Sequence, residues 1–164
     1  MDIVIFLLGW GAIAAQTWAM KRHFNMKETP QGVKVISALV LASAFSLSYL
    51  GFAQAQPLWA QLAGLGVQLS GLLVFWLAIR ESAQAKLLAA FDGGLPHGLL
   101  TTGPYGWVRH PFYTSYILHW AGGALGVCNL WGLGPGIAMT TSYFVAARDE
   151  EQKFERTEMA AQYA

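Results

Sequence analysis

Five long apolar runs make up most of this chain, and they restrict the folds that it can adopt. They cover residues 3–20, 33–53, 58–79, 112–127 and 131–147, with short polar segments between them. A helix needs roughly 20 mostly apolar residues to cross a bilayer. Charged residues make up only 12% of the sequence, about half the share that is usual in soluble domains. We therefore predict an all-α polytopic membrane protein. It would have about five transmembrane helices, the last two forming a short hairpin, and a cytoplasmic C-terminal helix over residues 148–164.

The basic residues predict how these helices are oriented. All ten lysines and arginines lie in or beside three segments, which follow the first, third and fifth runs. With five spans these segments share one side of the membrane, and the positive-inside rule makes that side cytoplasmic. We expect the N-terminus outside and the C-terminus inside, in a single domain of residues 1–164. Residues 1–92 would hold the first three helices, and residues 93–164 the loop, hairpin and tail.

Composition also limits the partners and the bound groups. A net charge of +1 gives no basic field for a nucleic acid, so none is predicted as a partner. The single cysteine, Cys128, excludes an internal disulfide and is expected to be buried as a small apolar residue. The histidines and this cysteine show no metal-ligand spacing, so no metal site is predicted. The small residues Gly64, Gly66, Ser70 and Gly71 in the third run are expected to bring helices close together.

One polar segment stands directly ahead of the fourth run. It reads Gly103-Pro104-Tyr105-Gly106-Trp107-Val108-Arg109-His110-Pro111-Phe112-Tyr113. Pro111 suits the first turn of a helix, which places Arg109 and His110 at the membrane edge. One interpretation is structural: Arg109 reaches lipid headgroups and His110 caps the helix. The other is a functional site, since ionisable residues at the membrane commonly serve function. The residues alone leave the two interpretations about equal.

Acidic residues gather directly after the fifth run, at Asp149, Glu150 and Glu151. They could occupy a solvated helix face, on which Asp149 and Lys153 have the spacing of a surface ion pair. Glu151 also shares a helix face with Glu155, so the like charges there favour a cationic partner nearby. The hairpin formed by the last two runs would bring this acidic segment to the same side as the polar segment ahead of the fourth run.

These two segments together resemble a known family. The stretch from Leu99 to Tyr113, L-L-T-T-G-P-Y-G-W-V-R-H-P-F-Y, resembles the core motif of the isoprenylcysteine carboxyl methyltransferase family. That family also takes in phospholipid N-methyltransferase-like membrane proteins. Its second block, E-E-x-x-L, is matched by E-E-Q-K-F, with Phe154 in place of leucine. The resemblance covers residues 96–163. It implies that S-adenosylmethionine binds at the cytoplasmic side, and that its methyl group passes to a lipophilic acceptor from the bilayer, such as an isoprenylcysteine carboxylate or a phospholipid amine.

The resemblance also implies which residues form the site. The cofactor would be bound by His97, Gly98, Leu99, Leu100, Tyr105, His110, Pro111, Phe112, Tyr113 and Glu150. Catalytic roles would fall to Arg109, Arg148 and Glu151. The arginine that handles a substrate carboxylate in the family lies four residues before the glutamate, where this chain has Ala146. Two other functions stay open: a catalytically silent membrane protein that retains the pocket, and a lipid-binding scaffold.

Overall fold

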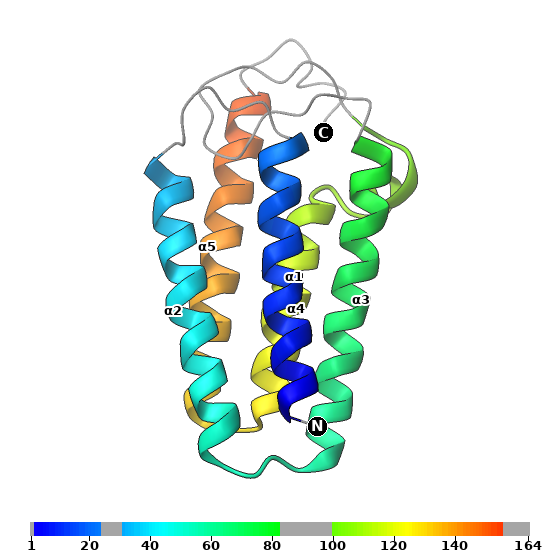
Figure 1. The fold of residues 1–164 in the computed structure, drawn as a ribbon. Helices are drawn as coiled ribbons and strands as arrows, with labels where there is room; N and C mark the ends of the chain where they lie inside the picture. The colour runs from blue at the N-terminus through cyan, green and yellow to red at the C-terminus, as the bar shows by residue number, and fades with distance from the viewer. Residues whose placement is uncertain (1, 24–30, 83–99, 156–164) are drawn as a thin grey trace.

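The computed structural model describes residues 2–23, 31–82 and 100–155, and over these residues the chain forms an up-and-down bundle of helices without strands (Figure 1). The elements are α1 (Asp2–His23), α2 (Gln31–Ala53), α3 (Leu58–Ser82), the short 3-10 helix η1 (Gly103–Gly106), α4 (Pro111–Val127) and α5 (Leu130–Glu155). Successive α-helices run antiparallel. Consequently η1, the start of α4 and the last turns of α3 and α5 meet at one end of the bundle, the η1 end. The turns between α2 and α3 and between α4 and α5 form the opposite, hairpin end.

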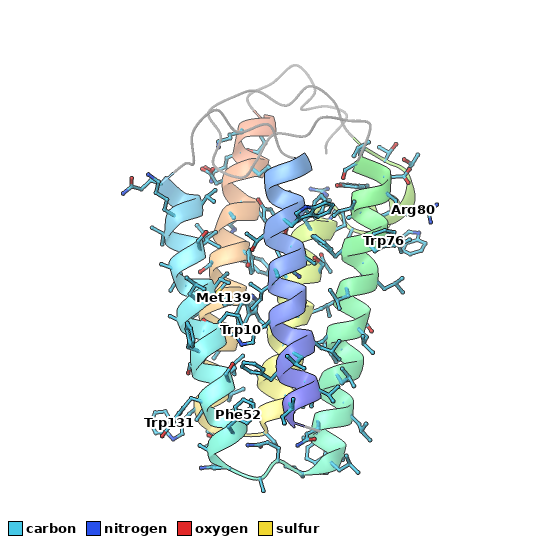
Figure 2. The ribbon with its side chains drawn as sticks, in the orientation of Figure 1. Trp10, Phe52, Trp76, Arg80, Trp131 and Met139 are labelled. Carbon is cyan, nitrogen blue, oxygen red and sulfur yellow. The ribbon has the colours of Figure 1, made fainter. Side chains whose placement is uncertain are left out.

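Large apolar side chains cover the outer surface of the bundle. Figure 2 shows Trp76 and Trp131 pointing away from it, whereas Met139 points inward. Exposed apolar residues occur on every α-helix, among them Leu7, Phe45, Leu73, Leu125 and Phe144. Two helices, α2 and α3, are long and apolar enough to cross a membrane. Membrane association follows from these surfaces, while the count of five spans stays a prediction.

The tightest contact in the bundle is between α3 and α4. A Cβ on Gly64 would lie 2.5 Å from the Gly122 carbonyl oxygen, and one on Gly71 would lie 2.8 Å from the Ser115 carbonyl oxygen. The helices can approach this closely only because no side chain stands between them. The packing role predicted for Gly64 and Gly71 is therefore confirmed.

The same role is wrong for the other two small residues of this helix. A Cβ on Gly66 would meet nothing within 4 Å, and Ser70 is exposed. An α-helix turns through about 100° per residue. Gly64 and Gly71, seven residues apart, therefore share a face, whereas Gly66 and Ser70 project from other faces.

An aromatic cluster fills the interior between α3, α4 and α5. Tyr116 lies at its centre, with its ring 5.0 Å from that of Tyr143 and 6.1 Å from that of Phe75. Trp120 and Met139 complete the cluster, with 2% and 0% of their surfaces exposed. Interdigitated rings of this size fix how the three helices sit against one another. The residues at the η1 end are thus carried by a rigid frame.

Two expectations for the C-terminal part of the chain are wrong. Cys128 is exposed, because it takes the left-handed conformation, φ 47°, that ends α4 and starts the tight turn to α5. The expected separate tail helix does not begin at Arg148, since α5 continues unbroken to Glu155. No glycine or proline lies between residues 136 and 155, so nothing in the sequence ends the helix at the membrane edge.

Candidate active site at the η1 end

A compact turn positions the residues that precede α4. The Tyr105 amide donates to the Thr102 carbonyl at 3.2 Å, and the Val108 amide donates to the Pro104 carbonyl at 3.0 Å. Gly103 has a φ of +58°, a backbone conformation that favours glycine, and a Cβ there would lie 3.0 Å from Glu81 Oε2, which would have to shift. The loop predicted ahead of the hairpin therefore contains an ordered helical turn, η1, packed on the end of α3.

The side chain of His110 links α4 to α5. His110 occupies the N-cap position of α4, but its side chain makes no capping hydrogen bond. Instead His110 Nε2 lies 3.2 Å from Glu151 Oε1, and His110 Nδ1 lies 3.7 Å from Glu150 Oε2. The capping interpretation is therefore wrong for this side chain. The imidazole joins residues that are about 40 positions apart in the sequence.

Glu150 and Glu151, the two glutamates of α5 beside this imidazole, are half-buried. His110 is the partner that the like charges around Glu151 required, and it is cationic when protonated. For Glu150, burial by the surrounding protein raises the pKa of the carboxyl group, and the neighbouring His110 and Tyr113 partly oppose that rise. The predicted surface pair is also present, with Lys153 Nζ 3.0 Å from Asp149 Oδ2.

Aromatic rings lie beside His110, on the side that faces the interior of the bundle. The Tyr113 ring lies 5.5 Å from the His110 ring and stacks on Tyr143 at 6.1 Å. Burial raises the pKa of Tyr105 well above its usual range. The Tyr105 hydroxyl is buried without a hydrogen-bond partner in the described part of the chain. The neighbouring Ser82 hydroxyl, which donates to the Ile79 carbonyl at 3.3 Å, partly opposes the rise in the pKa of Tyr105.

Other predicted site residues hold the segment in place or lie at its margin. Pro111 is fully buried and starts α4. The Phe112 ring packs edge-on against Phe75 at 5.8 Å, so it points toward the core. Leu100 is half-buried, and Arg109 and Arg148 are exposed. His97, Gly98 and Leu99 lie outside the described residues. Their proposed roles, like those of all these residues, stay predictions.

The structure adds two polar residues that the sequence did not single out. Glu81 and Ser82 end α3 and lie beside Gly103 and Tyr105 respectively. A glutamate that follows an arginine at the end of an apolar run looks like an ordinary membrane-edge residue. Only the packing of η1 on α3 brings it into the cluster. The described residues contain no group of three or more His, Cys, Asp or Glu side chains that could hold a metal ion.

Comparison with known proteins gives one match. The family model described as phospholipid methyltransferase matches residues 59–163, more than half of the chain. This range contains η1, α4, α5 and all of α3 but its first residue. It therefore includes Glu81, Tyr105, His110, Glu150 and Glu151 at the η1 end. No curated protein and no solved structure matches the chain.

Proposed function

Because the chain belongs to the phospholipid methyltransferase family, we propose that it uses S-adenosylmethionine to methylate a lipophilic acceptor at the η1 end of the bundle. One observation carries the proposal. The imidazole of His110 lies between the carboxylates of Glu150 and Glu151, which come from a different helix. A purely structural cap or headgroup contact would not need this convergence of three titratable groups.

The donor set around His110 fits the parts of the cofactor. Carboxylates such as Glu150 suit a ribose diol or an ammonium group, and the exposed guanidinium of Arg109 suits a carboxylate. The face of Tyr113 suits a sulfonium, which is a cation. The buried Tyr105 hydroxyl, unpartnered in the described part of the chain, is available to a further polar group. The fit is to a cofactor held by helix ends, since the sequence has no glycine-rich nucleotide loop.

The chemistry asks little of the protein beyond placement. The cofactor, when bound, supplies a methyl group on a positively charged sulphur, which is already an activated leaving group. The chain's contribution is to hold the acceptor in line and to exclude water, and such positioning can supply roughly 7–11 kcal/mol of the barrier. If the acceptor is an amine or a thiol, Glu151 or His110 can take the proton that it loses. His110 Nε2 lies 3.2 Å from Glu151 Oε1, so the two side chains hold each other in place.

The acceptor proposed is lipophilic and reaches the η1 end from the bilayer. The family description points to phospholipids, and the exposed apolar surface of the helices suits such a molecule. A carboxylate on the acceptor would have fewer suitable partners here. Ala146 stands at the position of the arginine that handles a substrate carboxylate in the family that the sequence resembles. The Ala146 side chain is buried, and Arg148 is exposed.

Calorimetry with S-adenosylhomocysteine tests the proposal on the purified protein in detergent. We expect the wild type to bind, and His110→Ala and Glu150→Ala each to bind about tenfold more weakly or worse. Losing a hydrogen bond to a charged group costs about 1.5–3 kcal/mol. Glu155→Ala is the matched control, because it removes an exposed carboxylate from the same helix. Wild-type affinity in both site variants would place the cofactor elsewhere.

A second experiment addresses the acceptor. The protein is incubated with a methyl-labelled donor and a lipid extract, and the labelled lipid is identified. We expect label in an amine-bearing phospholipid fraction that is lost in Glu151→Gln. Binding of S-adenosylhomocysteine without any labelled product would indicate a catalytically silent protein. Absence of binding would reject the proposal and favour a lipid-binding scaffold.

A further inference from the structure

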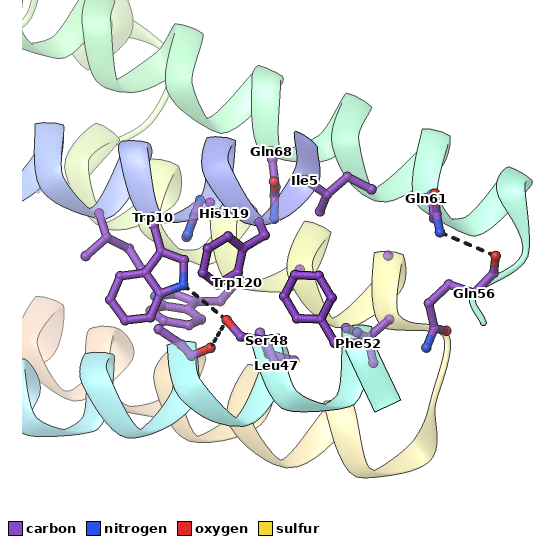
Figure 3. A pocket seen from close by; sticks show the side chains of 18 residues that line it. Ile5, Trp10, Leu47, Ser48, Phe52, Gln56, Gln61, Gln68, His119 and Trp120 are labelled. Carbon is purple, nitrogen blue, oxygen red and sulfur yellow. Dashed lines mark hydrogen bonds between the residues drawn. The ribbon is translucent and has the colours of Figure 1, made fainter. Parts of the chain in front are cut away.

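A second polar feature lies inside the bundle, away from the η1 end. A partly open cavity of about 80 Å³ is enclosed by α1, α2, α3 and α4 in the half nearer the hairpin end (Figure 3). The residues of α4 that line it run from His119 to Val127, whereas His110 precedes that helix. At 1.5 Å per residue, His119 lies about 13 Å along the helix from His110. The cavity is therefore separate from the candidate active site.

Two buried polar side chains in the wall of this cavity lack partners. Gln68 is 6% exposed and His119 is 4% exposed. Gln68 Oε1 and His119 Nδ1 are buried without a hydrogen-bond partner among the described residues. Leaving a buried polar atom unpaired costs about 1–3 kcal/mol. Both residues line the cavity, so the cavity wall holds an amide and an imidazole whose hydrogen-bonding capacity the described residues do not use fully.

The backbone of α4 makes room for the glutamine. A Cβ on Gly122 would lie 2.7 Å from Gln68 Cγ, and one on Gly123 would lie 3.4 Å from Gln68 Nε2. Two adjacent glycines lower helix propensity. Because they have no side chains, the Gln68 amide can lie across the face of α4. The amide thus reaches the cavity at a place where any larger pair of residues on α4 would crowd it.

The other side of the cavity is apolar and aromatic. Trp10 donates from Nε1 to Ser48 Oγ at 3.1 Å, and Ser48 in turn donates to the Ala44 carbonyl at 2.6 Å, so the serine hydroxyl is already committed (Figure 3). The rings of Phe6 and Phe52 contact each other between α1 and α2, with their centres 5.3 Å apart and their planes tilted by 58°. None of the described residues that line the cavity is an acid, a lysine or an arginine. A charged ligand would have no counter-charge there.

We propose that this cavity is a binding site for a neutral alcohol, whose hydroxyl group pairs with the side chains of Gln68 and His119 in its wall. A hydroxyl both donates and accepts, which matches one carbonyl oxygen and one imidazole nitrogen. The volume is several times the roughly 10–15 Å³ that a single water needs, so it accommodates a hydroxyl with its neighbouring carbon atoms. The rest of a longer lipid alcohol extends through the open side. The inference does not rest on the methyltransferase proposal.

Fluorescence quenching tests the site with tribromoethanol and tribromoethane as probes. Bromine quenches tryptophan on contact, and Trp10 and Trp120 both line the cavity. The other five tryptophans are exposed on the surface of the protein: Trp18, Trp59, Trp76, Trp107 and Trp131. They report the general presence of either probe in the detergent. We expect tribromoethanol to give a saturable excess of quenching over tribromoethane in the wild type.

Three variants make the test specific. Gln68→Leu removes the amide at nearly constant volume and should weaken the alcohol about fivefold or more, the factor for one neutral hydrogen bond. Gly51→Leu should abolish the excess by filling the cavity, because a Cβ there meets only Val127 Cγ2, at 4.0 Å. Gln16→Leu is the matched control. Gln16 is also buried with an unpartnered amide nitrogen, but it does not line the cavity, so its variant should retain the excess.

Several results would overturn the proposal. Equal quenching by the two probes in the wild type would mean that the cavity holds only water. An excess that persists in Gln68→Leu, or one that disappears equally in Gln16→Leu, would exclude a specific role for the amide. Size-exclusion chromatography establishes that each variant is folded. If Gln68→Leu does not fold, Gly51→Leu decides the question alone, and an undiminished excess in that variant rejects the site.

Discussion

Replacing Gly64 by alanine should separate the two helices that are closest together. The added Cβ would lie 2.5 Å from the Gly122 carbonyl oxygen and 2.6 Å from the Gly126 nitrogen. Both are backbone atoms, so no flexible side chain can move aside. Restoring an ordinary contact of 3.4 Å requires α3 and α4 to move apart by about 0.9 Å along this line. A gap of this size forfeits a quarter to a half of the dispersion energy of the surrounding contacts.

The expected loss is about 2–3 kcal/mol of unfolding free energy, at the upper end of what overpacking of a core usually costs. Thermal unfolding in a fixed detergent, followed by tryptophan fluorescence, should give a midpoint lower by roughly 4–12 °C for a chain of this size. Equilibrium unfolding by increasing mole fraction of a denaturing detergent gives the free energy itself. The two measurements should rank the variants in the same order.

Two other glycines provide the controls, one outside the α3–α4 contact and one within it. Gly66→Ala adds the same atom to the same helix where nothing lies within 4 Å, so it should be neutral or slightly stabilising. Gly126→Ala adds a Cβ in the α3–α4 contact, but 3.9 Å from the nearest atom, Gly64 Cα, and should change stability little. A Gly64→Ala protein as stable as Gly66→Ala would refute the close approach of α3 and α4.

Two further predictions concern pH and orientation. Burial raises the pKa of Glu150, so stability falls as the pH rises from the ordinary glutamate pKa to the raised value and stays lower above it, whereas below the ordinary pKa the carboxyl is neutral in both states. Without ligand, Glu150→Gln should therefore unfold at a higher temperature than the wild type at about pH 8 and at the same temperature at about pH 4; an equal difference at both pH values would contradict this. Cys128 is exposed and is the only cysteine, so a membrane-impermeant thiol reagent should label it in intact cells. A protein with Cys128→Ser and Gln152→Cys should be labelled only after permeabilisation, and the reverse pattern would invert the predicted topology.

The helices could be predicted from the sequence because their ends carry strong signals. The second apolar run covers residues 33–53 and α2 is Gln31–Ala53. The fourth run covers residues 112–127 and α4 is Pro111–Val127. Pro57 and Pro111 stand at helix starts, where a missing amide hydrogen does no harm. The end of α5 cannot be predicted in the same way, because no such residue marks the membrane edge there.

The site was only partly predictable, for a different reason. The antiparallel hairpin places His110 and Glu151 at the same end of the bundle, and this much follows from the order of the helices. Their distance of 3.2 Å depends on how α4 crosses α5, and side-chain packing sets that angle. Gln68 and His119 could not have been paired at all from the sequence. A single polar residue in an apolar run looks the same whether it faces lipid or an internal cavity.

The packed interior between the two sites limits how an acceptor can reach His110. Tyr116, Trp120 and Met139 are 6%, 2% and 0% exposed, and they fill the space between α3, α4 and α5 on the hairpin side of Tyr113. Interiors packed in this way have few voids larger than a water molecule. A lipid tail cannot pass through that layer along the axis of the bundle without displacing several aromatic rings. If methyl transfer takes place at the η1 end as proposed, the acceptor must approach sideways, between helices. An alcohol bound beside Gln68 would then be a different molecule from the one that is methylated. The two sites would then respond to different ligands, coupled only through the shared helix α4.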